Sequence, residues 1–473
     1  MPKNFRQLLS HGVLLGFIGC PLPASSADLA GLEASLKRIS IESALPGTYV
    51  AIVSRDQVLY SRATGDYALQ ARRAVDSKQL SPYLRLGSIT KTFNALLALR
   101  LAEAGQLSLA TLCPPQLALC PHHTFPTQRT AVSVEQLLEH TSGMADLTAK
   151  EFASAVPLSL AAAAQVAPAS RSIRWPPGNF SVYSNNNAAA FSALLNFYTH
   201  TAYENLLNTH VFVPLGLSSA TFARSEAVIA ALPPGHASDG NTVLPYWHVI
   251  YPAFGGLNLR AEDTVALLQM FLKRGRHRGQ RFVSEAALAR MEHPKTSISA
   301  RAGLTYGYGL GLYQWYQRGV LFFGHDGDAD GYLARFGYAP KLGLAYMLAI
   351  NSDNPTGLRA LRKEIESRLV GVGATSPLRY PLDKPALERV TGPYRAETTR
   401  FAWRPHTAAR IRVVRVDESL FTLDTAGHRK ELIPVSSSTF RRKEDGGPTI
   451  ILVSLGGATY LLGDDLGNYR KVP

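Results

Sequence analysis

The first part of the chain combines helical and strand-like patterns of apolar positions. Over residues 29–39, apolar side chains recur every three or four positions, which is the spacing of one helix face and predicts a helix. Residues 49–53 and 58–62 are strand-like runs around a short polar turn and predict a β-hairpin. Residues 88–104 carry apolar side chains on most of the helical circumference, so we expect a largely buried helix there.

The rest of the first 370 residues changes pattern twice. Residues 131–275 show mostly helical periodicity broken by Pro- and Gly-containing loops. Strand patterns return at residues 319–323, 333–338 and 342–350, and a further helix is expected over 359–369. Strands at both ends with helices between them indicate one antiparallel sheet completed by both ends of the domain and flanked by helices, an α+β arrangement.

The final hundred residues have a different character, with short strand-like runs and glycine-containing turns. The strand-like runs are residues 411–416, 420–423, 449–455 and 459–462. They predict a small all-β domain, an antiparallel sandwich or barrel, over residues 380–473. The first domain would then span residues 28–372, with residues 371–380 as the linker. We expect the β-domain to have a structural role rather than a catalytic or substrate-recognising one.

Composition narrows the class of protein. Of the 473 residues, 46% are hydrophobic and 18% are charged, which excludes a mainly disordered chain. The 49 basic and 35 acidic residues give a net charge of +14, but the basic residues are scattered and form no long run or nucleic-acid motif. We therefore expect no nucleic-acid partner and relate the charge to solubility or to attraction towards anionic envelope surfaces.

The N-terminus has the parts of an export signal. A basic start with Lys3 and Arg6 precedes an apolar core at residues 12–19, and small residues follow it. We expect residues 1–27 to be a signal peptide that is removed on export, which predicts a periplasmic or secreted protein.

A second interpretation of this leader involves a lipid anchor. Residues 17–20 (Phe-Ile-Gly-Cys) are a near-match to a bacterial lipoprotein box, in which Cys20 would carry the lipid and attach the protein to a membrane. No other stretch is long and apolar enough to cross a bilayer, so we expect no membrane-spanning helix in the mature protein.

The other two cysteines, Cys113 and Cys120, form an even pair seven positions apart. In an exported protein they can close a small disulfide loop, and the Pro114-Pro115 turn between them favours that pairing. The alternative is two free thiols that never meet.

Ser88 and Lys91 form the first candidate for chemistry. Positions three apart share one helix face, so the hydroxyl and the amine can hydrogen-bond. A lysine in a partly dehydrated pocket loses some preference for its charged form and can accept the serine proton. The helix N-terminus also favours negative charge developing at Ser88. Because this spacing is common, a solvated pair without function is the alternative.

Two further segments carry polar groups that could join this pair. Tyr183 and Asn185 follow the turn cluster at residues 176–178, which could present them to a cleft. A phenol near a lysine can relay protons, and an asparagine amide can hold a substrate carbonyl. His325 and Gly327 follow a short apolar run that predicts an edge-type strand, and a glycine there permits close approach of another backbone or a substrate.

In this order, Ser-x-x-Lys, Tyr-x-Asn and His-x-Gly resemble the pattern of the serine β-lactamase and penicillin-binding superfamily. The branch that looks most similar contains class C β-lactamases, D-alanyl-D-alanine carboxypeptidases and esterases with the β-lactamase fold. Supporting segments lie at residues 137–143, 214–217, 255–257 and 308–311. The resemblance covers roughly residues 30–370, and the segment at 392–394 resembles a β-domain often appended to this family.

The resemblance implies a β-lactamase/transpeptidase-like domain and a set of roles. Ser88 would be the acylated nucleophile, Lys91 its proton acceptor, and Tyr183 the group that carries a proton to the leaving group. Substrate-binding positions would be Asn185, His325, Asp326, Gly327 and Asp328. The backbone N–H groups of Ser88 and Asp328 would form the oxyanion hole.

The implied activity is hydrolysis of an ester or amide in a small molecule or peptide, without metal or organic cofactor. An esterase or D-alanyl peptidase fits better than a true β-lactamase, because His325 stands where most β-lactamases carry Lys. An alternative of a different class is a catalytically silent relative that binds peptidoglycan fragments.

Asp326 is a departure from the family pattern, which has Thr or Ser there to bind a substrate carboxylate. If Asp326 lines the cleft, it repels such substrates and favours neutral or cationic ones. His325, if protonated, would partly offset that repulsion. In the alternative, Asp326 points away and pairs with an arginine, since neighbours on a strand face opposite sides.

Other motifs are weaker. The acidic positions at 326–330 imitate the start of a calcium loop, but Gly337 stands where its final Glu should be. His122 and His123 lack a third zinc ligand nearby in the sequence. Residues 87–92 lack the glycine that a P-loop places directly before its lysine, and the chain has no Gly-x-Ser-x-Gly motif of an α/β-hydrolase.

Overall fold

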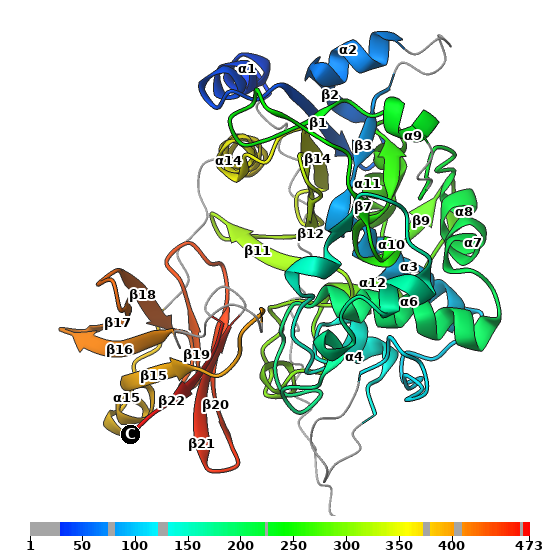
Figure 1. Ribbon diagram of the computed structural model, residues 1–473. Helices are drawn as coiled ribbons and strands as arrows, with labels where there is room; N and C mark the ends of the chain where they lie inside the picture. The colour runs from blue at the N-terminus through cyan, green and yellow to red at the C-terminus, as the bar shows by residue number, and fades with distance from the viewer. Residues whose placement is uncertain are drawn as a thin grey trace, which may run out of the picture.

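The computed structural model describes residues 29–73, 81–121, 131–222, 226–371, 379–401, 409–463 and 467–473. Figure 1 shows a larger domain of sheet and helices with a smaller β-domain packed beside it. The expected signal peptide with Cys20, the pair His122 and His123, and most of the expected linker lie outside the described residues.

The larger domain is built on a six-stranded sheet in the order β11-β12-β13-β14-β1-β2, with every neighbouring pair antiparallel. Its strands are β1 (Gly47–Ser54), β2 (Val58–Gly65), β11 (Tyr313–Gln317), β12 (Val320–Asp328), β13 (Leu333–Ala339) and β14 (Leu344–Ile350). The expected hairpin is confirmed as β1 and β2, and β1 pairs with β14 from Thr48–Ile350 to Ser54–Leu344. The two ends of the domain therefore complete one sheet.

Strand β14 shows why the sheet needs helices on both faces. Its alternate residues 344, 346, 348 and 350 join a core with α1 (Leu32–Glu42) and α14 (Pro355–Val370). Residues 345, 347 and 349 belong to the larger core on the other face, to which α11 (Asp263–Leu272) contributes. Because every residue of this strand is buried, it reads in the sequence as a continuous apolar run rather than as an alternation.

Most of the helices and strands between β2 and β11 are helices, many of them short. After α2 (Asp66–Arg73) come α3 (Thr90–Glu103), α4 (Val134–Leu138), α5 (Leu160–Ala164), α6 (Asn185–Thr199), α7 (Tyr203–Leu207), α8 (Val213–Leu215), α9 (Glu226–Ala230), α10 (Pro252–Gly255), α12 (Glu285–Glu292) and α13 (Ile298–Arg301). Short two-stranded pairs join β3 (Tyr83–Arg85) to β8 (Asn258–Arg260), β4 (Ala153–Ser154) to β7 (His248–Val249), β5 (Gly235–His236) to β6 (Val243–Leu244), and β9 (Arg276–His277) to β10 (Gln280–Arg281). Within the described ranges, no helix is both long and apolar enough to cross a membrane.

The C-terminal domain begins with α15 (Lys384–Val390) and is a closed antiparallel barrel, one of the two architectures expected. Its strands are β15 (Gly392–Ala396), β16 (Arg410–Val416), β17 (Ser419–Asp424), β18 (Arg429–Pro434), β19 (Thr439–Arg441), β20 (Ile450–Leu455), β21 (Ala458–Gly463) and β22 (Gly467–Lys471). Alternate residues such as Val413, Leu432 and Leu461 fill its own apolar core. The barrel is therefore a folding unit with a separate interior.

The barrel also packs against the larger domain through a shared apolar cluster. Phe180, Val182 and Tyr306 of the larger domain contribute to the same buried cluster as Tyr460 and Leu462 of the barrel. Phe180 and Tyr460 have ring centroids 5.5 Å apart. This contact places the segment after β15 next to the helical part of the larger domain, where the candidate site lies.

Candidate active site

Ser88 lies in a single 3₁₀ turn, Gly87–Ile89, that leads directly into α3. Its Oγ atom is 2.9 Å from Lys91 Nζ and 2.9 Å from the hydroxyl of Tyr183. The expected geometry of Ser88 and Lys91 follows from the first helical turn, which places residues three apart on one face. Tyr183 comes from the loop before α6, so its approach to Ser88 depends on the tertiary fold.

Lys91 is enclosed by the protein and is only 3% exposed. Its Nζ donates a hydrogen bond to the Phe254 carbonyl at 2.6 Å and lies 5.1 Å from the centre of the Tyr183 ring. Burial lowers the pKa of Lys91 well below its ordinary value, Asp146 acts in the opposite direction, and Arg400 lowers it further. Burial therefore favours the neutral amine, which can accept a proton.

The hydroxyl of Tyr183 remains protonated at neutral pH. Loss of water around its hydroxyl raises the pKa of Tyr183 well above the ordinary value, although the hydrogen bond to Ser88 and the charge of Arg400 oppose this. Its ring packs 4.3 Å from the ring of His140, which holds it in place beside the nucleophile. A neutral phenol in this position can donate a hydrogen bond or pass a proton, but it is not a base at neutral pH.

Strand β12 passes close to the nucleophile turn. A side chain at Gly327 would collide with the Leu86 carbonyl oxygen, and one at Gly87 would meet the backbone of Asp328. Gly87 also has a φ of +50°, which favours glycine. The backbone segments that carry the N–H groups of Ser88 and Asp328 are thus brought side by side, as an oxyanion hole requires.

The part of β12 that borders the site is a free edge, although β12 as a whole is not the edge strand that we expected. Strand β11, which the sequence analysis missed, pairs with β12 from Gln317–Val320 to Tyr313–Gly324. From His325 to Asp328, β12 is paired only with β13 among the described strands. The short length of β11 leaves this segment available to a substrate.

His325 is buried, and its imidazole packs among the aromatic rings of Tyr183, Tyr308 and Tyr313. The Asp326 carbonyl can only accept, so Nδ1 of His325 carries the proton and Nε2 accepts from the Tyr308 hydroxyl at 2.8 Å. Burial, with a further contribution from Lys91, lowers the pKa of His325 to about 4. His325 is therefore neutral at neutral pH, which corrects the expectation that it could supply positive charge there.

Asp326 pairs with an arginine, as in the alternative that the sequence left open. Its carboxylate accepts a hydrogen bond from Arg335 Nη1 at 2.7 Å and another from the Tyr313 hydroxyl. Arg335 is itself buried, and its guanidinium lies 3.9 Å from the centre of the Trp315 ring. Arg335 compensates this charge on the neighbouring strand, which argues against the expected repulsion of carboxylates. The assignment of Asp326 to substrate binding stays a prediction.

Asn185 is the first residue of α6 and is held by Asp146, a residue that the sequence analysis did not select. The backbone N–H of Asn185 donates to Asp146 Oδ1 at 2.7 Å, and its Nδ2 donates to Oδ2 at 3.3 Å. With the amide nitrogen fixed in this way, the buried Oδ1 of Asn185 has no partner among the described residues. The atom of Asn185 that is left without a partner is thus an acceptor, whereas we had expected its amide to hold a substrate carbonyl. Its role in substrate binding stays a prediction.

Arg400 is the second functional candidate that was missed, and it belongs to the segment after β15 in the C-terminal domain. Its Nε donates to Asp146 Oδ2 at 2.8 Å, and its guanidinium carbon lies 4.6 Å from the centre of the Tyr183 ring. No local pattern marks this arginine in the sequence, since Asp146 is 254 positions away. The β-domain thus forms part of the site wall, in contrast to the purely structural role that we expected.

Cys113 and Cys120 are joined in a disulfide in the structure, with Cα atoms 5.8 Å apart. Both residues are buried and belong to the larger core. Across the described ranges, no three His, Cys, Asp or Glu side chains gather as potential metal ligands, and the acidic positions at 326–330 form no such group.

Comparison with known proteins identifies the larger domain. Residues 30–368 match the model of the β-lactamase family. Penicillin-binding protein 4 of Amycolatopsis lactamdurans is 25% identical over 359 residues, covering 73% of this chain and 91% of that protein.

Two solved structures share the fold to different extents. The octameric penicillin-binding protein homologue from Pyrococcus abyssi has a TM-score of 0.58 and 20% identity, covering 94% of this chain and all of that one. The class C β-lactamase from Rhodobacter sphaeroides has a TM-score of 0.55 and 16% identity, covering 72% of this chain and 99% of that one. Because the family match spans residues 30–368, more than half of its length, the chain belongs to the β-lactamase family.

Proposed function

We propose that this protein is a serine hydrolase that cleaves an ester or amide through an acyl-enzyme on Ser88. One observation carries this proposal: Lys91 Nζ and the Tyr183 hydroxyl both lie 2.9 Å from Ser88 Oγ. A nucleophile with one potential base and one potential acid in direct contact is the arrangement that acyl transfer needs.

Acylation would begin with proton transfer from Ser88 to Lys91. The lowered pKa of Lys91 makes the neutral amine available, and the Phe254 carbonyl orients it by accepting one of its hydrogens. Ser88 Oγ attacks the substrate carbonyl, whose oxygen becomes negative. The N–H groups of Ser88 and Asp328 would stabilise that charge, and the 3₁₀ turn before α3 directs further backbone dipoles towards it.

Collapse of the tetrahedral intermediate requires a proton for the leaving group. The Tyr183 hydroxyl can supply its proton and recover one from the lysine ammonium, because its raised pKa keeps it protonated between cycles. Water then takes the place of the leaving group, and the same groups assist its attack on the ester of Ser88. No step draws on His325, which would instead shape the cleft together with Tyr308.

The substrate class is proposed at the level of esters and amides, including peptides. His325 in place of a strand lysine favours an esterase or D-alanyl peptidase over a true β-lactamase. The similarity to a penicillin-binding protein supports cell-wall peptides as one candidate substrate. We also propose that the protein acts after export, as a periplasmic, secreted or lipid-anchored enzyme, on the strength of its N-terminal pattern.

Covalent labelling tests the proposal directly. Incubation with a fluorophosphonate or with nitrocefin, followed by peptide mass spectrometry, should place the adduct on Ser88, and Ser88→Ala should remove both labelling and turnover of p-nitrophenyl esters. Ser454→Ala is the matched control, because it makes the same change at an exposed position of the barrel. Wild-type turnover in Ser88→Ala would overturn the assignment, and a wild-type protein that resists every label would favour the silent binder.

A further inference from the structure

Residues 397–401 of the C-terminal domain cross to the larger domain beside the candidate site. The Trp175 indole donates to the Glu397 carbonyl at 3.1 Å, and the Asp146 N–H donates to the Arg400 carbonyl at 2.8 Å. The rings of Phe401 and Phe152 are 6.2 Å apart. Backbone and side-chain contacts together fix this segment, so the position of Arg400 is set by the interface between the domains.

The two members of the Arg400–Asp146 pair differ in what they present to the cleft. Asp146 has a side chain that is 0% exposed, and its oxygens already accept from Leu147, Asn185 and Arg400. Arg400 is 45% exposed and uses only Nε in this pair. Among the described residues, none accepts a hydrogen bond from its Nη1 or Nη2 atoms. A ligand therefore meets the outer edge of the guanidinium rather than the carboxylate.

Other cationic side chains around Ser88 offer less to an anion. Burial favours the neutral form of Lys91, and His325 is neutral at neutral pH. Arg335 is buried and engaged by Asp326. The charge of Arg400 nevertheless acts within the site: burial raises the pKa of Tyr183 and of Asp328, and Arg400 opposes that rise at both groups.

We propose that Arg400 is a specificity-determining residue that binds a carboxylate on the leaving-group side of the substrate. This inference rests on the proposed function, because the leaving-group side is defined by Tyr183, over whose ring the guanidinium lies. The guanidinium edge with Nη1 and Nη2, which no described residue occupies, matches the two oxygens of a carboxylate. Esters or peptides whose departing half carries a free carboxylate are then the preferred substrates, the opposite of the preference expected from Asp326.

A matched pair of esters tests this charge preference. Phenyl acetate with a meta-carboxylate on the phenol is compared with its meta-carboxamide analogue, so that the acyl group is identical and the leaving groups are similar in size. We expect the wild type to have a kcat/KM about tenfold higher for the carboxylate ester, the scale of one half-exposed charge-assisted pair. Added salt should reduce this ratio.

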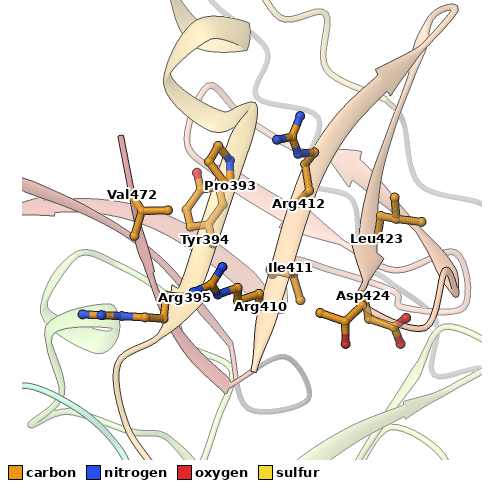
Figure 2. A pocket seen from close by; sticks show the side chains of 10 residues that line it. Pro393, Tyr394, Arg395, Arg410, Ile411, Arg412, Leu423, Asp424 and Val472 are labelled. Atoms are coloured by element: carbon orange, nitrogen blue, oxygen red, sulfur yellow. The ribbon is translucent and has the colours of Figure 1, made fainter. Parts of the chain in front are cut away.

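Variants at position 400 assign the preference to this side chain. Arg400→Gln should bring the ratio of the two kcat/KM values to about one, whereas Arg400→Lys should keep part of it as a point charge. Arg412→Gln is the control, because it removes the same charge from the same domain. Arg412 lies on β16 and lines a barrel cavity of about 430 Å³ together with Tyr394 and Leu423. Figure 2 shows these side chains. This control should retain the wild-type ratio.

Binding to the Ser88→Ala variant separates this inference from the proposed function. By calorimetry, 3-hydroxybenzoate should bind more tightly than 3-hydroxybenzamide, and Arg400→Gln in the same background should remove the difference. The inference is wrong if the two compounds bind alike or not at all, or if Arg400→Gln lowers both kcat/KM values equally and keeps their ratio. Binding that discriminates in a protein without ester turnover would overturn the proposed function alone.

Discussion

The buried carboxylate of Asp146 joins the two domains and the candidate site, so replacing it gives a prediction with a defined size. Asp146 Oδ1 accepts from the backbone N–H groups of Leu147, at 2.8 Å, and Asn185, at 2.7 Å. Its Oδ2 accepts from Asn185 Nδ2 at 3.3 Å and from Arg400 Nε at 2.8 Å. Asp146→Asn can keep the first pair of bonds, but it places an NH₂ group opposite the two donors of the second pair.

The expected cost follows from these lost bonds. A hydrogen bond to a charged group is worth about 1.5–3 kcal/mol, and Arg400 is half-exposed, so water recovers part of its loss. We expect Asp146→Asn to lower the free energy of unfolding by about 2–3 kcal/mol, and Arg400→Gln by about 1 kcal/mol. The double variant should lose about 1 kcal/mol less than the sum, because both changes remove the same contact.

Urea denaturation followed by tryptophan fluorescence and circular dichroism measures these values, with two transitions fitted if the domains unfold separately. The exposed Asp56 pairs with Lys273 at 3.1 Å, and Asp56→Asn serves as a control that should change stability by less than about 0.5 kcal/mol. Asp146→Asn with wild-type stability, or losses that add fully in the double variant, would refute the coupling of Arg400 to Asp146.

Three further predictions address pH, the disulfide and Asp326. Wild-type kcat/KM should fall as pH drops through the lowered pKa of Lys91, and a rate that rises only near pH 10 would contradict this. The free energy of unfolding should rise with pH between that pKa and 10.5, because in this range only the unfolded chain binds the proton. Cys113→Ser should lower the free energy of unfolding by about 2.5 kcal/mol, the value expected for a disulfide that closes a loop with a sequence separation of 7. Complete alkylation of Cys113 and Cys120 without reductant would exclude the bond. Asp326→Asn should cost about 2 kcal/mol, because buried Arg335 keeps only the more distant carboxylate of Glu366, at 3.9 Å, and it should change the two test esters alike. A selective gain for the carboxylate ester would restore the repulsion hypothesis.

The site also explains why a histidine can stand at position 325 without carrying charge. Its two ring nitrogens are both engaged, one by the Asp326 carbonyl and one by Tyr308, in a pocket that excludes water. The positive charge that this strand lacks is supplied from another direction, by Arg400 of the barrel. An appended domain can therefore alter the charge of a cleft while the nucleophile and its two partners stay in place.

Local sequence patterns were sufficient for the elements whose structure depends on near neighbours. The hairpin β1–β2 and helix α3 follow from the periodicity of their own residues. The contact of Ser88 with Lys91 follows from helical geometry within a single turn. The ordered motifs indicated the family, because their residue types and order are properties of the chain itself.

Tertiary structure alone decided the electrostatics and the walls of the site. Which of His325 and Asp326 faces the cleft depends on the pleat of β12 and on Arg335 from the neighbouring strand. Asp146 and Arg400 meet across 254 positions because an apolar interface docks the barrel on the larger domain. Such contacts leave no periodic trace in the sequence, since they depend on packing between distant surfaces rather than on the conformation of either segment.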